Sequence, residues 1–182
     1  MNVPGGGKAH FDLLADYNRW MNGKLYQVVS ELTPEQISEH RGAFFGSVLG
    51  TLNHIMVGDI LWLQRFSCHP ACTESLKEVA LLPRPSGLDQ ILFEDFQELK
   101  ARRSWLDEQI CNWIQGLTGE DLDYVLSYRN SRGIPASKNF SALVLHFFNH
   151  QTHHRGQVST LLSQLDKASD VTDLLMLIPD SD

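Results

Sequence analysis

Histidines are the residues of this sequence whose type and spacing point most directly to chemistry. His150 and His154 lie four positions apart in a segment with helical periodicity. Side chains at this spacing project from one face of a helix, with Cβ atoms about 6 Å apart. Two imidazoles placed in this way can chelate one divalent metal ion. The spacing alone is weak evidence, since His146 and His150 share it.

The position of this pair within its helix strengthens the signal. His150 and His154 interrupt an apolar stripe that should face the protein core. The stripe consists of Leu143, Phe147, Val158, Leu161 and Leu165. A buried imidazole needs a partner for each polar nitrogen, and one shared metal ion would satisfy both residues. Two separately hydrogen-bonded structural histidines are the alternative that the residues alone leave open.

His54 is the natural third ligand, because it lies in another helical segment that can present it across a bundle core. A lone histidine in such a place is also commonly a partly buried, hydrogen-bonded residue, and this alternative stays open. His146 lies about 40° from His150 around the helix, and His153 about 60° to the other side. Both are left out of the ligand set, and His153 is expected at the surface.

The cysteines do not indicate a disulfide framework, since there are only three of them. Cys68, His69 and Cys72 have the types of zinc ligands, but no second ligand pair follows at a matching distance. Free thiols near a helix end are therefore expected. The remaining histidines stand at the ends of predicted elements and are expected at the surface: His10, His40 and His69.

The length, composition and net charge of the sequence limit the fold classes and functions that it can have. A chain of 182 residues with 42% hydrophobic and 20% charged residues is typical of one globular domain. A net charge of −7 argues against nonspecific binding to nucleic acid or to an anionic membrane surface. No apolar run approaches the roughly 18–20 residues of a membrane-spanning helix, and the first residues lack the features of a signal peptide. We expect a single soluble domain, residues 1–182, in the cytoplasm.

Four long segments with helical periodicity must position the histidines: residues 10–32, 47–66, 86–117 and 137–165. Ser47 suits the N-cap of the second segment, and residues 86–89 match a capping pattern at the start of the third. Residues 33–36, Thr-Pro-Glu-Gln, predict a short extra turn. Two charged residues, Asp59 and Arg103, interrupt the apolar stripes of the second and third segments.

Four helices with connections of up to about 20 residues favour an all-α, up-down four-helix bundle. The long connection before the last helix has strand-like residues at 124–128 and turn residues at 130–133, so a hairpin fits there. Residues 166–169 should close the last helix. The apolar tail at 174–178 is expected to pack back on the body.

Three motifs, in order along the chain, resemble those of a known family. The sequence NHQTHHRGQ at residues 149–157 resembles the fourth-helix signature of the DinB-like metal-binding bundle proteins, a group that includes the YfiT-type metal hydrolases. The sequence TLNH at residues 51–54, followed by Asp59 and Trp62, resembles the second-helix motif of that family. The sequence YNRWMN at residues 17–22 resembles its first-helix motif.

The resemblance implies a bundle of the DinB/YfiT-like type, a homodimer, and a nickel or zinc ion held by His54, His150 and His154. Three neutral imidazoles leave such an ion at least one open position, as in reactive rather than structural sites. Among relatives, some resemble thiol-dependent transferases or isomerases that use mycothiol, bacillithiol or glutathione, and others are described as hydrolases.

We therefore expect a metal-dependent enzyme that activates a low-molecular-weight thiol for transfer to an electrophilic small molecule. A hydrolase that activates water, and a non-catalytic metal-binding stress-response protein, are the alternatives. No catalytic residue is assigned from the sequence. Asp59 and Gln157 could orient ligand imidazoles, although Asp59 could equally face solvent. Arg155 could hold a carboxylate of the thiol or form a salt bridge on the helix surface.

Overall fold

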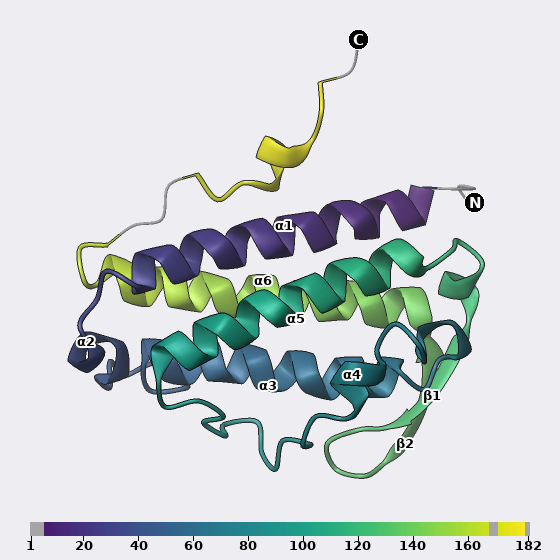
Figure 1. Ribbon diagram of the computed structural model, residues 1–182, viewed down its shortest axis with the longest axis horizontal. Coiled ribbons are helices and arrows are strands. Elements are labelled where there is room, and N and C mark those ends of the chain that lie inside the picture. The colour runs from purple at the N-terminus through teal and green to yellow at the C-terminus, as the bar shows by residue number, and fades with distance from the viewer. Residues whose placement is uncertain (1–5, 168–170, 181–182) are drawn as a thin grey trace.

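The computed structural model describes residues 6–167 and 171–180 and confirms the all-α bundle. Its long helices are α1 (Gly6–Val29), α3 (Val48–Phe66), α5 (Phe96–Gly116) and α6 (Phe140–Ser163), which lie side by side in Figure 1. The shorter helix α2 (Pro34–Ser38) links α1 to α3. The observed bounds of α1, α3 and α6 lie within a few residues of the prediction.

The helix starts are fixed by side chains that accept backbone hydrogen bonds in the first turn. Ser47 accepts one from the N–H of Gly50 at 3.0 Å, as predicted. Asn139 accepts one from the N–H of Ala142 at 3.0 Å and begins α6. A complete capping box between Thr33 and Gln36 begins α2.

The end of α6 is followed by a residue in the left-handed backbone region. Asp166 has a φ of 54°, which stops helical hydrogen bonding. The rest of the predicted closing segment, Ala168 and Ser169, lies outside the described residues.

The four helices do not alternate strictly in direction. Figure 1 shows α1 and α6 running one way along the bundle and α3 and α5 running the other way. The connection from α3 to α5, which includes η1 (Pro70–Cys72) and α4 (Lys77–Ala80), therefore returns along the length of the bundle. Four-helix bundles tolerate such long crossovers. Here the crossover passes beside α3 and takes part in the candidate site.

The predicted start of the third helix at residues 86–89 is wrong, because α5 begins at Phe96 with Asp95 as its cap. The preceding residues are bound to α3 through the buried side chain of Asn53. Its Oδ1 accepts hydrogen bonds from the N–H groups of Leu92 and Phe93 at 2.8 and 3.0 Å. Its Nδ2 donates to the carbonyl of Phe93 at 3.0 Å. These bonds occupy backbone groups that a helix would need, so Leu92 reaches the core from a loop.

The predicted hairpin is present. Strand β1 (Val125–Arg129) pairs antiparallel with β2 (Pro135–Asn139), and Tyr128 lies opposite Ala136. Gly133 in the turn has a φ of 74°, a backbone conformation that favours glycine. The hairpin places Tyr128 beside α3, where its ring lies 5.5 Å from that of Trp62.

The apolar tail packs back on the body only in part, since η3 (Leu174–Leu177) contacts α1 but several of its side chains stay exposed. Tyr17 donates a hydrogen bond to the carbonyl of Thr172 at 2.7 Å, so the chain does return to α1. The short helix η3 buries none of its residues, and Leu175 and Met176 are 71% and 59% exposed. These side chains do not pack on the body of the protein.

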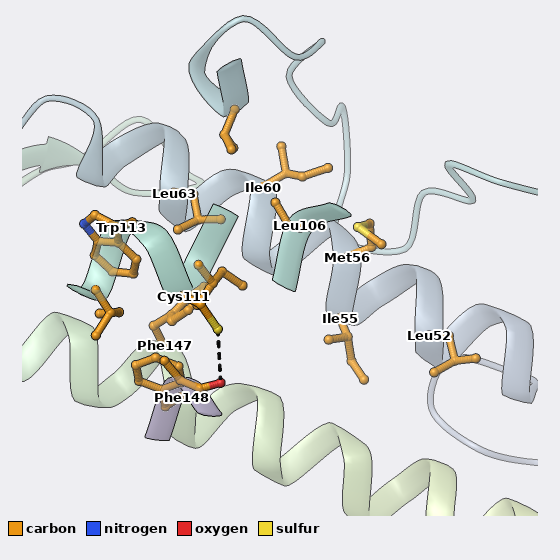
Figure 2. Packing of buried hydrophobic residues seen from close by; sticks show 14 of the residues in the cluster. Leu52, Ile55, Met56, Ile60, Leu63, Leu106, Cys111, Trp113, Phe147 and Phe148 are labelled. Carbon is orange, nitrogen blue, oxygen red and sulfur yellow. Dashed lines mark hydrogen bonds between the residues drawn. The ribbon is translucent and has the colours of Figure 1, made fainter. Parts of the chain in front are cut away.

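The core lies between the long helices and consists mainly of aliphatic and aromatic side chains. Figure 2 shows part of this core, with Ile60 and Leu63 from α3, Leu106 and Trp113 from α5, and Phe147 and Phe148 from α6. In the same view, the thiol of Cys111 donates to the carbonyl of Ala15 at 3.8 Å and links α5 to α1. None of the helices in the described ranges combines the length and apolar character needed to cross a bilayer.

The charged residues that interrupt the apolar stripes form one buried cluster. Arg103 of α5 pairs with Asp59 of α3 at 2.5 Å and with Asp107 of its own helix at 2.8 Å. Asn18 and Asn22 of α1 donate hydrogen bonds to Asp107 at 3.1 and 2.8 Å. All five side chains are buried. The cluster therefore connects three helices through ion pairs and hydrogen bonds, while Oδ1 of Asp59 and Nε of Arg103 are buried without a hydrogen-bond partner among the described residues.

Candidate metal centre

The structure brings His54 of α3 together with His150 and His154 of α6. The nitrogens of the three rings that could act as ligands lie within 4.8 Å of one another. Within residues 6–167 and 171–180, no other group of three His, Cys, Asp or Glu side chains is gathered closely enough to hold a metal ion. His54 and His154 are buried, and His150 is partly buried at the edge of the site.

Two of the rings are oriented by hydrogen bonds at their outer nitrogens. Nδ1 of His54 lies 2.7 Å from the carbonyl oxygen of Leu88, in the crossover that passes beside α3. Nδ1 of His154 lies 2.8 Å from Oε1 of Gln157, one turn further along α6. Both partners are oxygens that accept, so each Nδ1 carries the proton of a neutral imidazole. Each Nε2 is then left with a lone pair.

These two Nε2 atoms face each other at 3.1 Å. Two lone pairs at this distance repel unless a cation lies between them. Two nitrogens bound to one metal ion at roughly 2.0–2.1 Å are about 2.9–3.4 Å apart, for bond angles between octahedral and tetrahedral values. The pair therefore fits a shared divalent ion. His150 completes the group, with its ring centroid 4.4 Å from that of His154 and 5.2 Å from that of His54.

The histidines are held in the neutral form that binds metal. Burial lowers the pKa of His54 and of His154. Burial, followed by the nearby imidazoles of His154 and His54, lowers the pKa of His150 to about 3. At neutral pH a metal ion would therefore not have to displace protons from these rings.

Two further residues shape the centre and were not singled out in the sequence. The ring of Phe45 stacks on that of His54, with centroids 3.7 Å apart and planes at 15°. Gly58 of α3 lies against His150, since a Cβ at this position would stand 2.7 Å from Cε1 of that ring. A glycine inside the predicted second helix was a usable signal of a close approach. The position of Phe45 could not be foreseen from the sequence, because it depends on the loop before α3.

The sequence is similar to known proteins over most of its length. The sequence model of the DinB family matches residues 1–179. The chain belongs to the DinB family. Protein DinB of Bacillus subtilis (strain 168) is 28% identical to it over 160 residues, which are 88% of each chain. The family resemblance of the three helix motifs is thereby confirmed.

This DinB-family chain has a pocket of about 240 Å³ beside the centre. His54 and His150 line its inner end, and α3, α6 and the turn of the hairpin form its walls. His146 also lines the pocket, with its ring centroid 6.2 Å from that of His150, but it is not a member of the triad. His153 is exposed, as predicted.

The sequence singled out Gln157, Asp59 and Arg155 as residues that could assist the metal ligands or bind the substrate. Gln157 orients His154, as predicted. Asp59 does not face solvent, because it is completely buried and paired with Arg103. Arg155 neither forms a salt bridge on the helix surface nor lines the pocket beside the triad. It is buried and donates hydrogen bonds to Asn18 and Thr152, so it belongs to the interior of the bundle.

The segment after α3 contains no second metal centre among the described residues. Cys68 and Cys72 are free thiols, as predicted. His69 was expected at the surface, but it is 2% exposed. Its Nδ1 accepts from the N–H of Ala71 at 3.0 Å, and its Nε2 donates to the carbonyl of Asp121 at 3.1 Å. His69 is therefore a structural residue that joins two loops.

Proposed function

We propose that this DinB-family protein is a metal-dependent enzyme that activates a low-molecular-weight thiol for transfer to an electrophile. His54, His150 and His154 would hold the divalent ion, nickel or zinc. The observation that carries the proposal is the pair of Nε2 atoms that face each other at 3.1 Å while each Nδ1 lies against an oxygen. A hydrogen-bonded structural pair would need a proton between them, and the partners of both Nδ1 atoms argue against one.

The arrangement suits a reactive centre rather than a closed structural one. Three imidazoles leave an ion at least one position for another ligand, and the pocket opens beside His54 and His150. A bound divalent ion lowers the pKa of a thiol or of water, which makes either a stronger nucleophile at neutral pH. In a transfer, the thiol sulfur bonds to the electrophilic carbon, the leaving group departs with its electron pair, and the thiol proton is released.

Residues around the triad orient the imidazole rings and shield the reacting groups from water. Leu88 and Gln157 fix two of the rings, and Phe45 covers one face of His54. Trp62 and Tyr128 form apolar walls on the pocket side. These groups limit access of water to the nucleophile and hold the reacting molecules in place.

The test is the consumption of monochlorobimane by protein loaded with zinc or nickel, measured with cysteine, glutathione, bacillithiol and mycothiol in turn. Monochlorobimane should be consumed much faster with one of these thiols than with the others. His150→Ala should reduce this rate to that of the uncatalysed reaction, and His10→Ala, a change at an exposed histidine of α1 that does not line the pocket, should leave it unchanged. Ester or amide hydrolysis without any thiol dependence would contradict the proposal and favour a hydrolase. Metal binding with neither activity would favour a non-catalytic protein.

A further inference from the structure

The pocket beside the triad contains a cation that has no acidic partner among the described residues. Arg65, in the last turn of α3, lines this pocket together with Trp62 and Tyr128. Its guanidinium carbon lies 4.6 Å from the ring centroid of Trp62 and 5.6 Å from that of Tyr128. Two adjacent aromatic rings hold a guanidinium in place and reduce its contact with water.

Arg65 has no acidic partner in the described part of the chain. None of the ion pairs there includes it, and its Nε is buried without a hydrogen-bond acceptor. A cation in the last turn of a helix interacts favourably with the helix dipole. That role explains the charge, but it requires neither the stacking on two rings nor the buried, unbonded Nε.

The charge around the pocket is positive, although the protein as a whole carries −7. No Asp or Glu is among the residues that line the pocket. Burial and, after it, the charge of nearby Arg84 lower the pKa of Arg65. A buried or partly buried polar group without a partner is costly, so the site favours the arrival of an anion.

We propose that Arg65 binds a carboxylate of the substrate and thereby selects small organic acids for this pocket. A guanidinium pairs with a planar carboxylate through two parallel hydrogen bonds, and one guanidinium suffices for one such group. The rest of the ligand would lie against Trp62 and Tyr128 and extend toward His150. The part of this inference that places a reacting group near the triad rests on the proposed function; the carboxylate site itself does not.

The first experiment uses the metal-free full chain and a probe without a thiol. Uniformly ¹⁵N-labelled protein is titrated with 3-phenylpropionate and, separately, with the neutral 3-phenyl-1-propanol. The Arg65 Nε–H and Trp62 indole N–H resonances are followed. Both resonances should shift saturably with the carboxylate. The alcohol should bind at least about tenfold more weakly than the carboxylate, because it lacks the charge-assisted pair. Equal affinities, or no saturable shift with the carboxylate, would overturn the proposal.

Variants test whether Arg65 causes the preference for the carboxylate over the alcohol. Arg65→Met should remove it and leave the affinity for the alcohol nearly unchanged, and Arg65→Lys should retain part of it through the remaining charge. Arg102→Met is the matched control, because Arg102 also stacks on a tryptophan, with 4.9 Å between its guanidinium carbon and the ring of Trp105. Arg102 lies on α5 and does not line the pocket. A preference that persists in Arg65→Met, or that disappears equally in Arg102→Met, would refute the assignment.

A second experiment separates this inference from the proposed function. Cobalt-loaded protein is titrated with 3-mercaptopropionate and 3-mercapto-1-propanol, and the sulfur-to-cobalt charge-transfer band is recorded. The acid should bind about tenfold more tightly, and Arg65→Met should abolish the difference. If no such band forms with either thiol, the proposed thiol chemistry is wrong, but the metal-free titration still decides whether Arg65 binds a carboxylate.

Discussion

His54 and His154 face each other through Nε2 atoms that lie 3.1 Å apart, and the opposite nitrogen of each ring is bound to an oxygen. The two outer hydrogen bonds determine which nitrogen of each ring is protonated, and so they determine what can lie between the rings. A metal-binding histidine commonly donates its other N–H to a carbonyl or carboxylate, which fixes its orientation. Leu88 and Gln157 have this role here.

Replacing Gln157 with Leu should weaken metal binding. The variant removes the acceptor for Nδ1 of His154, so the ring can turn or take the other tautomer. Loss of such a partner typically lowers metal affinity about 10–100-fold. Zinc affinity measured by competition with a chelator tests this, with Gln164→Leu, near the exposed end of α6, as the control. An unchanged affinity in Gln157→Leu would show that the hydrogen bond does not orient a ligand.

Replacing Gly58 with Ala should separate metal binding from stability. The added Cβ would stand 2.7 Å from Cε1 of His150 and displace that ring. Glycine to alanine inside a helix usually stabilises the fold by about 0.5–1 kcal/mol. We therefore expect zinc affinity to fall about tenfold or more, with little loss of thermal stability.

The matched control for this substitution is Gly156→Ala on α6, where an added Cβ meets nothing within 4 Å. It should leave zinc affinity unchanged. If the two alanine variants bind zinc equally well, then the contact between Gly58 and His150 does not constrain the site.

The local parts of the fold could be predicted because they depend on neighbouring residues. The capping box of Thr33 and Gln36 and the N-cap at Ser47 are both present, and each involves residues that lie within one helical turn in the sequence. The start of α5 could not be predicted in this way. The competing interactions come from Asn53, which is 39 residues before Leu92 and binds its backbone only in the folded chain.

The candidate site shows the same division. His150 and His154 could be paired from helical spacing, and His54 from the family motif. The carbonyl of Leu88 could not be foreseen as the partner of His54, because it lies in a crossover 34 residues away that was expected to be helical. The roles of Asp59 and Arg155 stayed open in the sequence for a related reason: Asp59 pairs with a residue of α5, and Arg155 binds a residue of α1.

Arg103→Met should strongly destabilise the protein. It would leave the buried carboxylates of Asp59 and Asp107 without their shared cation. Breaking a buried ion pair by removing one partner commonly costs about 3–5 kcal/mol. Urea denaturation at pH 8 measures the free energy of unfolding, and Arg102→Met, a neighbour outside the cluster, should change it by only about 0.5 kcal/mol. A small loss in Arg103→Met would mean that the cluster contributes little to stability.

Asp107 should make the stability of the protein fall as pH rises from about 4 to about 6. Burial raises the pKa of Asp107 to about 6, against the opposing charge of Arg103, whereas an aspartate in an unfolded chain has a pKa of about 3.9. Between these values the folded protein holds a proton that the unfolded chain has released. The contribution of this group is therefore fully present below about pH 4 and is lost as pH rises through about 6.

Comparison with Asp107→Asn isolates this effect, because the variant keeps the side-chain shape and all the histidines. The free energy of unfolding of the wild type minus that of the variant should decrease by roughly 2–3 kcal/mol between pH 4 and pH 6.5, since each pKa unit corresponds to about 1.4 kcal/mol. Urea titrations at several pH values, made without metal, give this difference directly. A difference that stays constant or grows over this range would show that Asp107 is ionised throughout. In that case Arg103 and the amides of Asn18 and Asn22 would outweigh the effect of burial.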